Sequence, residues 1–581
     1  MTLAARGGRN RNGNGEDLLA HPGYPMSPGL KTGATMLLLA VWLPVAWHLT
    51  LVATADGLAL TAIRTTAQAL RTTRPITGLT EVDPAITPPG TVTVLVVWAV
   101  LLLGGFGLLL WQAARAATRG SRRRTQRGLA TSRRPAADPV GDGVVFALDE
   151  GRPVRSRVED SALVVAPNRS GKTTGLAAGL VVDAPGPVLA TSTKADLVRL
   201  SAGARRSTGL ILVFDPDQVM RWPDRARWDV VAGCGDVREA TVRAKAMVTA
   251  KPLDGTRNGN FFAESAEIVL RCLLHAAALD AQTMREVLSW ARDFDDEEPY
   301  AILRTHPDAA PGWDKDLAKY ARGAAPETVS SLEMSLGLAL KPLADPAVLD
   351  LVCPAPPGED PGLVIDPAAF VASTDTLYVL AEGGSDTSSA PLATALVASV
   401  DRAARKASQY TATGRLPVPL TFVLDEAANV APIPGLPALM TDGGGRGISV
   451  WTMVQTFSQL RARWGRDGAD TLWGAGTIKV VLGGLSEVED LDRLSRLVGE
   501  RRVLRESDTE GDRDTTSWST ERERIMPPEA IRALPVGQAL LFYRAQPATV
   551  VSLRFHRDRP DAEVFDRSQR WSLDQEGHGP S

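Results

Sequence analysis

Cysteine and histidine are scarce in this chain, which has 3 cysteines and 6 histidines among 581 residues. Cys234, Cys272 and Cys353 lie far apart and form no Cys-x-x-Cys pair, which argues against a disulfide framework and against a zinc knuckle. The histidines form no His-Glu-x-x-His motif, so a zinc hydrolase is not expected. An excess of positive charge is also missing, because the formal net charge is −3. The chain as a whole is therefore not a basic nucleic-acid binder.

Long uncharged runs, by contrast, are present near the amino end. Residues 34–55 and 91–114 contain no Asp, Glu, Lys or Arg, and each run has about the 20 residues that a membrane-spanning helix needs. Two buried core helices, or a signal peptide for the first run, are the alternatives. We predict a transmembrane region of two helices with a short external loop over 34–114. A disordered cytoplasmic N-terminus is expected before it, over the polar residues 1–33.

Arginines set the expected orientation of these two spans. Eight arginines and no acidic residue lie between Arg115 and Arg134. Because basic residues flank membrane spans on the cytoplasmic side, both termini are predicted to be cytoplasmic. The expected localisation is the cell inner (plasma) membrane, multi-pass, with the soluble region in the cytoplasm. The arginine run is also expected to contact membrane lipids of negative charge, and a DNA-binding arm is the alternative for it.

Short apolar runs alternate with helical stretches in the rest of the chain. One such stretch, 391–405, is rich in alanine and valine. This alternation predicts an α/β fold with a mainly parallel sheet and helices on both faces. Between Cys234 and about Val348 the strand pattern stops and helical periodicity replaces it, which predicts an inserted all-α domain. The expected buried strands are 162–165, 186–191, 210–214, 376–381, 420–424, 448–453 and 477–482.

The carboxyl-terminal part of the chain carries three further expectations. Residues 538–543 and 549–555 are predicted to form a β-hairpin. Residues 505–524 are polar and charged, and we expect an exposed, mobile loop there. The tail from about Asp558 is also polar and is expected to be disordered. The predicted domains beyond the membrane region are a basic linker over 115–142, a nucleotide-binding domain over 143–233 and 349–556, the all-α domain over 234–348 and a polar tail over 557–581.

The nucleotide-binding assignment starts from a tight loop between a buried strand and a helix. The loop ends in Gly171-Lys-Thr173, which is the context of a P-loop. Backbone N–H groups of such a loop face the phosphates of a nucleotide, the lysine reaches the β- and γ-phosphates, and the hydroxyl of the next residue binds Mg²⁺. A chance Gly-Lys-Thr at a helix start is the alternative. The residues expected to bind ATP are Ala166, Asn168, Arg169, Ser170, Gly171, Lys172, Thr173 and Thr174, with Lys172 also catalytic.

A second acidic motif follows the apolar run Leu420–Leu424. A buried strand that ends in Asp425 and Glu426 delivers two carboxylates to the edge of the sheet where ligands bind in doubly wound folds. Asp425 is expected to hold Mg²⁺ together with Thr173, and Glu426 to orient or deprotonate the attacking water. A strand end with a solvated pair of acids is the alternative.

Two further residues are candidates for catalysis. Gln455 follows the strand over 448–453 and is expected near Asp425, where it would sense the γ-phosphate; a loop-capping glutamine is the alternative. Arg446 lies in the turn Gly443-Gly-Gly-Arg-Gly447. Since guanidinium charge stabilises phosphoryl transfer, Arg446 is a candidate finger that acts on the nucleotide of a neighbouring subunit. A plain surface arginine is the alternative.

Taken together, these motifs resemble the type IV secretion coupling ATPases of the TraG/TraD kind. The resemblance covers about residues 34–556. It rests on the P-loop, on Asp425-Glu-Ala-Ala-Asn-Val430 with Ile433-Pro-Gly435, and on Gly445-Arg-Gly-Ile-Ser449. Further similar segments are Val188–Asp196, Asn260–Ala266, Gln455–Leu460 and Ala475–Gly484. Ala166 departs from the family, which more often has glycine there, and this departure bears on the geometry of the loop.

The resemblance implies a P-loop RecA-like motor domain with an inserted all-α domain, assembled as a homo-hexamer. It implies ATP and Mg²⁺ as cofactors, and single-stranded DNA with an attached relaxase (the relaxosome) as the cargo moved toward channel proteins of type IV secretion. A membrane receptor that recruits relaxase or effector proteins, and uses nucleotide mainly for assembly, is the alternative. A chromosome translocase of the FtsK kind ranks below both, because that family usually has four membrane spans and a terminal winged-helix module.

Overall fold

The computed structural model describes residues 142–577, with gaps at 253–258, 324, 385–387 and 510–514. An eleven-stranded sheet has the strand order β2-β1-β13-β12-β9-β3-β8-β7-β4-β6-β5. Its strands are β1 (Asp142–Asp149), β2 (Arg152–Arg157), β3 (Ser161–Val165), β4 (Val188–Ser192), β5 (Ile211–Phe214), β6 (Thr376–Leu380), β7 (Leu420–Leu424), β8 (Ile448–Val454), β9 (Ile478–Leu482), β12 (Gln538–Tyr543) and β13 (Thr549–Leu553).

The sheet is parallel over most of its width. All neighbours from β9 to β5 pair in parallel, as the apolar runs predict. The remaining strands, β12, β13, β1 and β2, pair antiparallel. The edge hairpin β1–β2 was not predicted, because β2 reads Arg-Pro-Val-Arg-Ser-Arg and buries only Val154 and Ser156. Arginines on such an exposed edge prevent pairing with other chains.

Side chains of the central strands alternate between two apolar cores. On β3, Leu163 and Val165 belong to one core, whereas Ala162 and Val164 belong to the other. Because successive residues of a strand point to opposite faces, a strand buried on both faces reads as the continuous apolar run found in the sequence. The α/β fold with helices on both faces is therefore confirmed.

Different helices cover the two faces of the sheet. The core that contains Val164 also contains residues of α4 (Ala178–Asp183), α5 (Asp196–Arg205) and α20 (Ala562–Gly577). The core that contains Leu163 includes residues of the helices on the opposite face. These are α13 (Pro367–Val371), α14 (Ala390–Gln409), α15 (Ala427–Val430), α16 (Leu436–Asp442), α17 (Phe457–Ala475), α18 (Val488–Val498) and α19 (Pro528–Arg532).

The region predicted as an all-α domain, 234–348, consists of helices and turns in its described residues. Its helices are α6 (Val237–Ala250), α7 (Gly259–Leu279), α8 (Met284–Trp290), α9 (Glu298–Thr305), α10 (Trp313–Ala321), α11 (Pro326–Leu340) and α12 (Pro346–Leu351), with a 3₁₀ turn at Lys341–Ala344. One apolar core runs without interruption from the sheet into these helices. Contacts thus join the helices to the sheet, and the domain boundaries stay a prediction.

The predicted localisation needs correction. Among the described residues, no helix combines the length and the apolar character needed to cross a membrane. This finding contradicts the expectation of a multi-pass protein of the inner membrane with its motor domain in the cytoplasm. The two predicted spans, the N-terminus over 1–33 and the arginine run expected to contact membrane lipids all lie outside the described residues.

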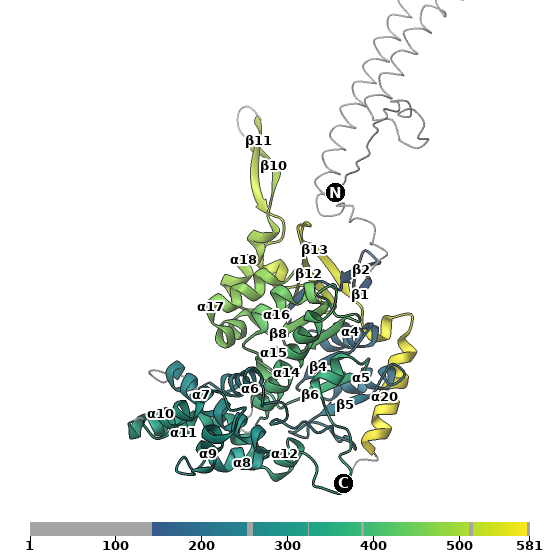
Figure 1. Cartoon of the computed structure of the whole chain (residues 1–581). Coiled ribbons are helices and arrows are strands. Elements are labelled where there is room, and N and C mark those ends of the chain that lie inside the picture. Colours follow the sequence, from purple (N-terminus) through teal and green to yellow (C-terminus); the bar gives the residue numbers. More distant parts are fainter. Residues whose placement is uncertain (1–141, 253–258, 324, 385–387, 510–514, 578–581) are drawn as a thin grey trace, which may run out of the picture. The chain divides into compact units, whose positions relative to one another are not determined.

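Two predictions for the carboxyl-terminal region are wrong. Residues expected to form a mobile loop instead form a separate two-stranded sheet, β10 (Glu500–Thr509) with β11 (Thr515–Arg524) (Figure 1). Cross-strand charge pairs such as Arg501 with Glu523, 3.0 Å apart, support a hairpin that has few apolar residues. The tail expected to be disordered contains α20, which lies along α5. There it buries Phe565 completely and places Glu576 2.6 Å from Arg199.

Candidate nucleotide-binding site

The P-loop lies at the carboxyl end of β3, between β8 and β9. The N–H of Ala166 donates to the carbonyl of Val454 at 2.9 Å, so the loop starts in register with the end of β8. Positive φ values occur at Arg169 (62°) and Gly171 (88°), and not at Ala166. A side chain at position 166 is therefore compatible with the loop, because only a positive φ at this position would require glycine.

The eight residues predicted to bind ATP have different environments in this loop. Asn168 and Arg169 are exposed at its tip, whereas the Ser170 and Lys172 side chains are buried. The hydroxyl of Thr174 donates to the carbonyl of Gly171 at 3.5 Å. After Lys172 a π-helical turn, Thr173–Ala177, leads into α4. This turn widens the start of the helix that follows the loop, a feature often found at functional sites.

The acidic pair at the end of β7 meets the P-loop directly. The Thr173 hydroxyl donates to Oδ2 of Asp425 at 3.1 Å, and Lys172 Nζ lies 3.6 Å from the other oxygen, Oδ1. Lys172 also forms an ion pair with Oε1 of Glu426. The strand order explains these contacts, since β3 and β7 are separated only by β8. Residues more than 250 positions apart in sequence are thereby brought into contact.

Gln455 joins the same cluster from the end of β8. Its side-chain amide Nε2 donates to Oε2 of Glu426 at 2.7 Å. Asn429 donates to the same oxygen at 3.2 Å, from α15. Glu426 itself has a left-handed backbone, with φ of 54°, which is uncommon for a residue other than glycine, aspartate or asparagine. The Glu426 carboxylate is thus held by Lys172, Gln455 and Asn429 at once.

Burial dominates the electrostatics of this cluster. Asp425, Glu426 and Lys172 are each less than 10 % exposed. Desolvation raises the pKa of the Asp425 carboxyl, and the nearby Lys172 ammonium opposes that rise. Oδ1 of Asp425 and the hydroxyl of Ser170 are buried without a hydrogen-bond partner. The Asp425 carboxylate, which accepts from the Thr173 hydroxyl, offers the oxygen ligands that a hard cation prefers.

An aromatic residue beyond the predicted set also borders the P-loop. Phe555, just after β13, lies so close that an ideal Cβ placed on Gly171 would come within 2.9 Å of its ring. A Cβ on Gly175 would lie 3.3 Å from the ring, and one on Gly537 would lie 2.8 Å away. Phe555 therefore fills a notch formed by three glycines and supports the loop from outside. No sequence pattern indicated this role, because Phe555 and Gly171 lie 384 positions apart (555 − 171).

Arg446 is not brought to the cluster. It precedes β8, whereas Gln455 follows the same strand, so the two residues lie at opposite ends of this strand. The seven residues of β8 separate the two ends by roughly 20 Å at 3.3 Å per residue. Arg446 instead lies 3.3 Å from Asp442 and donates to the hydroxyl of Ser408 at 3.4 Å.

The comparisons with known proteins bear on the family and the fold. Residues 419–536 match the family model described as "TraM recognition site of TraD and TraG". No curated protein matches the chain by sequence. Among solved structures, the bacterial conjugative coupling protein TrwBdeltaN70, in an unbound monoclinic form, matches with 17 % identity and a TM-score of 0.53, over 73 % of this chain and 90 % of that one.

Nucleotide-bound structures of the same neighbour match as well. TrwB in complex with a non-hydrolysable ATP analogue matches at 17 % identity and a TM-score of 0.51, over 73 % of this chain and 90 % of that one. TrwB in complex with ADP and Mg²⁺ matches at 17 % identity and a TM-score of 0.50, over 70 % and 88 %. At this identity the matches establish a shared fold. With the family match over 419–536, they confirm the resemblance of this chain to the TraG/TraD-type conjugative coupling proteins.

Proposed function

We propose that this protein is a P-loop ATPase that couples ATP hydrolysis to the transfer of single-stranded DNA, with its attached relaxase, into a type IV secretion channel. This proposal rests on the contacts of Lys172 and Thr173 with Asp425 and Glu426 at the carboxyl ends of β3 and β7. The carboxyl ends of the strands are where ligands bind in open α/β sheets. The family match and the fold shared with a conjugative coupling protein support the cargo.

Lys172 has two partners available in the proposed cycle. Its ammonium contacts the Glu426 and Asp425 carboxylates in the structure. With ATP in the loop, the same ammonium neutralises charge on the β- and γ-phosphates. This exchange releases the Glu426 carboxylate, which then accepts a proton from the attacking water. Gln455 stays hydrogen-bonded to Glu426 and orients it toward the γ-phosphate.

Thr173 and Asp425 are the proposed ligands of Mg²⁺. The Thr173 hydroxyl and the Asp425 carboxylate already face each other at 3.1 Å. Oδ1 of Asp425, which accepts no hydrogen bond and lies 3.6 Å from Lys172 Nζ, supplies a further acceptor. When bound, the metal neutralises charge that develops on the phosphates. The Ser170 hydroxyl of the same loop is also buried without a hydrogen-bond partner.

Hydrolysis in the presence and absence of single-stranded DNA tests the proposed function. We expect the full-length chain to hydrolyse Mg·ATP, and single-stranded DNA to increase the rate. ATP binding without DNA-stimulated hydrolysis would instead favour a receptor that recruits relaxase or effector proteins and uses nucleotide for assembly. The receptor function stays a second candidate because the family model that matches residues 419–536 is described as a TraM recognition site.

For Arg446 we propose a role only between subunits of a homo-hexamer. Arg446 lies at the amino end of β8, whereas Lys172 lies beyond the carboxyl end of the neighbouring strand β3. Arg446→Ala is expected to lower hydrolysis and leave nucleotide affinity nearly unchanged. Mixing Arg446→Ala with Glu426→Gln subunits should restore part of the activity, since some interfaces then pair an intact Glu426 with an intact Arg446. An inactive mixture, with assembly verified by size, would reduce Arg446 to the surface arginine that its contact with Asp442 suggests.

A further inference from the structure

A groove of about 670 Å³ lies between α6 and α14, away from the P-loop. The segment Ile433-Pro-Gly435, which follows α15, forms part of its wall. The lining is rich in cations and has few carboxylates, which are Asp236 and Asp401. The basic side chains that line the groove are Arg238, Lys245, Arg402, Arg405 and Lys406.

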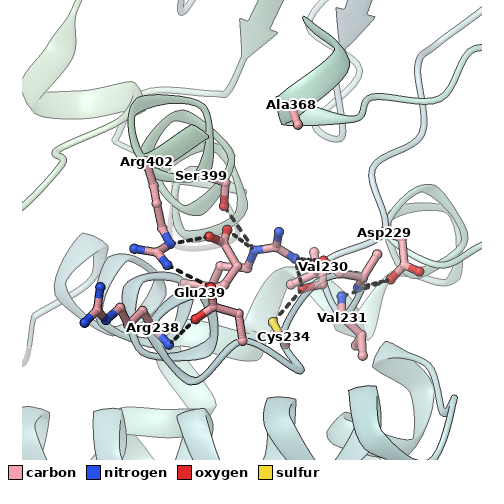
Figure 2. Close-up of polar contacts among 12 residues, drawn as sticks. Asp229, Val230, Val231, Cys234, Arg238, Glu239, Ala368, Ser399 and Arg402 are labelled. Carbon is pink, nitrogen blue, oxygen red and sulfur yellow. Dashed lines mark hydrogen bonds and ion pairs between the residues drawn. The ribbon is translucent and has the colours of Figure 1, made fainter. Parts of the chain in front are cut away.

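Two of these cations are fixed by acidic partners. Arg402 lies 2.8 Å from Glu239 and 3.0 Å from Asp236. Figure 2 shows it reaching from α14 toward Glu239 on α6. Arg405 lies 2.8 Å from Asp401 and 2.7 Å from Asp442. These pairs hold α6, α14 and α16 together, and they leave the two guanidinium groups largely neutralised.

The other three cations lie on the rim and are exposed. Within the described part of the chain, the side chains of Arg238, Lys245 and Lys406 form no ion pair. Lys245 acts on Glu267 only through its longer-range field. A rim with three free cations, over a floor whose charges already cancel, attracts a polyanion that arrives from solvent.

Tyr410 adds an aromatic surface at the end of α14, in the same groove. Its side chain is 81 % exposed, the highest fraction among the large hydrophobic and aromatic residues of the described chain. A solvent-exposed ring beside free cations is the combination with which proteins bind single strands, since bases stack on aromatics while cations follow the phosphates. An acidic peptide would use the cations and would have no use for the ring.

We propose that this groove binds the phosphodiester backbone of a single-stranded nucleic acid through Arg238, Lys245 and Lys406, while Tyr410 stacks on a base. This site is distinct from the nucleotide site and rests on the proposed function, which supplies the nucleic acid. It also offers a route to the hydrolytic centre. Ile433, in the groove wall, lies only seven residues after Glu426 (433 − 426).

The segment from Glu426 to Ile433 is held by hydrogen bonds at both ends. Within it, α15 carries Asn429, which donates to the Glu426 carboxylate at 3.2 Å. The carbonyl of Ile433 accepts from the indole N–H of Trp464 at 2.8 Å, so the wall segment is anchored to α17. A nucleic acid bound in the groove would contact the segment that positions Asn429 and, through Asn429, the Glu426 carboxylate. Nucleic-acid stimulation of hydrolysis should therefore depend on the groove.

The test measures binding of a fluorescein-labelled oligothymidylate of about 20 nucleotides, longer than a typical single-strand site, to the full-length chain over a range of salt concentrations. Lys245→Gln and Lys406→Gln are each expected to weaken binding and to lower the salt slope by about 0.7, the value for one phosphate contact on a single strand. Tyr410→Ala is expected to weaken binding roughly 5- to 100-fold with the slope unchanged. Tyr410→Phe, which keeps the ring, should bind as the unchanged chain does.

Lys315→Gln serves as the matched control, because Lys315 is exposed on α10 and lies outside the groove. All variants should keep the DNA-free rate of ATP hydrolysis, and Lys245→Gln, Lys406→Gln and Tyr410→Ala alone should lose DNA stimulation. If these three variants bind and respond like Lys315→Gln, the site is overturned and the proposed function is left intact. If the unchanged chain itself fails to bind the oligonucleotide but binds polyglutamate at the groove, an acidic protein segment is the ligand and the proposal is overturned.

Discussion

Lys172→Ala is expected to reduce ATP hydrolysis on the order of 100-fold or more, the typical loss when one preorganised group that stabilises transition-state charge is removed. Lys172 is the cation that the P-loop presents to the β- and γ-phosphates, and the described residues of the cluster offer no second ammonium or guanidinium in its place. Steady-state hydrolysis with Mg·ATP measures the effect. Normal turnover by this variant would contradict the assignment of the loop.

The structure adds a second consequence of this substitution. Removing Lys172 leaves Asp425 and Glu426 adjacent, buried and without a cation. Breaking a buried ion pair by removing one partner typically costs about 3–5 kcal/mol, so a lower melting temperature is expected as well. Lys172→Ala/Glu426→Gln removes one of the two charges, and it should recover part of the stability without recovering hydrolysis. Lys315→Ala, on the exposed surface of α10, is the control for both measurements.

The arrangement of this cluster was largely predictable from the chain. Apolar runs that end in Gly171-Lys-Thr173 and in Asp425-Glu426 indicated two buried strands, and parallel strands place their carboxyl ends at one edge of a sheet. Gln455 was expected at the same edge for the same reason, and it lies 2.7 Å from Glu426. These predictions succeed because strand direction fixes which end of each strand faces the ligand.

Other features depend on contacts that no local pattern encodes. No local pattern indicated that Phe555 fills a notch of three glycines against the P-loop. Arg446 is a different case: it precedes the predicted strand over 448–453 and Gln455 follows it, so that strand already placed the two residues at opposite ends. The tail helix α20 was mistaken for disorder because its composition is polar. One apolar face of α20, which contains the buried Phe565, is enough to pack this helix onto the core beside the sheet.

Glu426→Gln is expected to separate nucleotide binding from hydrolysis. The loss of a general base typically costs about 100- to 10,000-fold in rate, and Glu426 is the carboxylate placed to accept the proton of the attacking water. Its amide replacement still offers an oxygen to Gln455 and Asn429, which donate to the present carboxylate at 2.7 and 3.2 Å. The local structure should therefore persist. Rapid-mixing measurements of the hydrolysis step, with binding followed separately, test this prediction.

The affinity of Glu426→Gln for ATP distinguishes the role of Glu426 from the role of Asp425. Lys172 pairs with the Glu426 carboxylate, and ATP must compete for that ammonium. Removing the charge frees Lys172, so ATP should bind at least as tightly as it does to the unchanged chain. Asp425→Asn, in contrast, should weaken binding in a Mg²⁺-dependent way, because it removes the proposed metal ligand. If Glu426→Gln loses ATP affinity to the same extent, the two carboxylates do not divide their roles between water and metal.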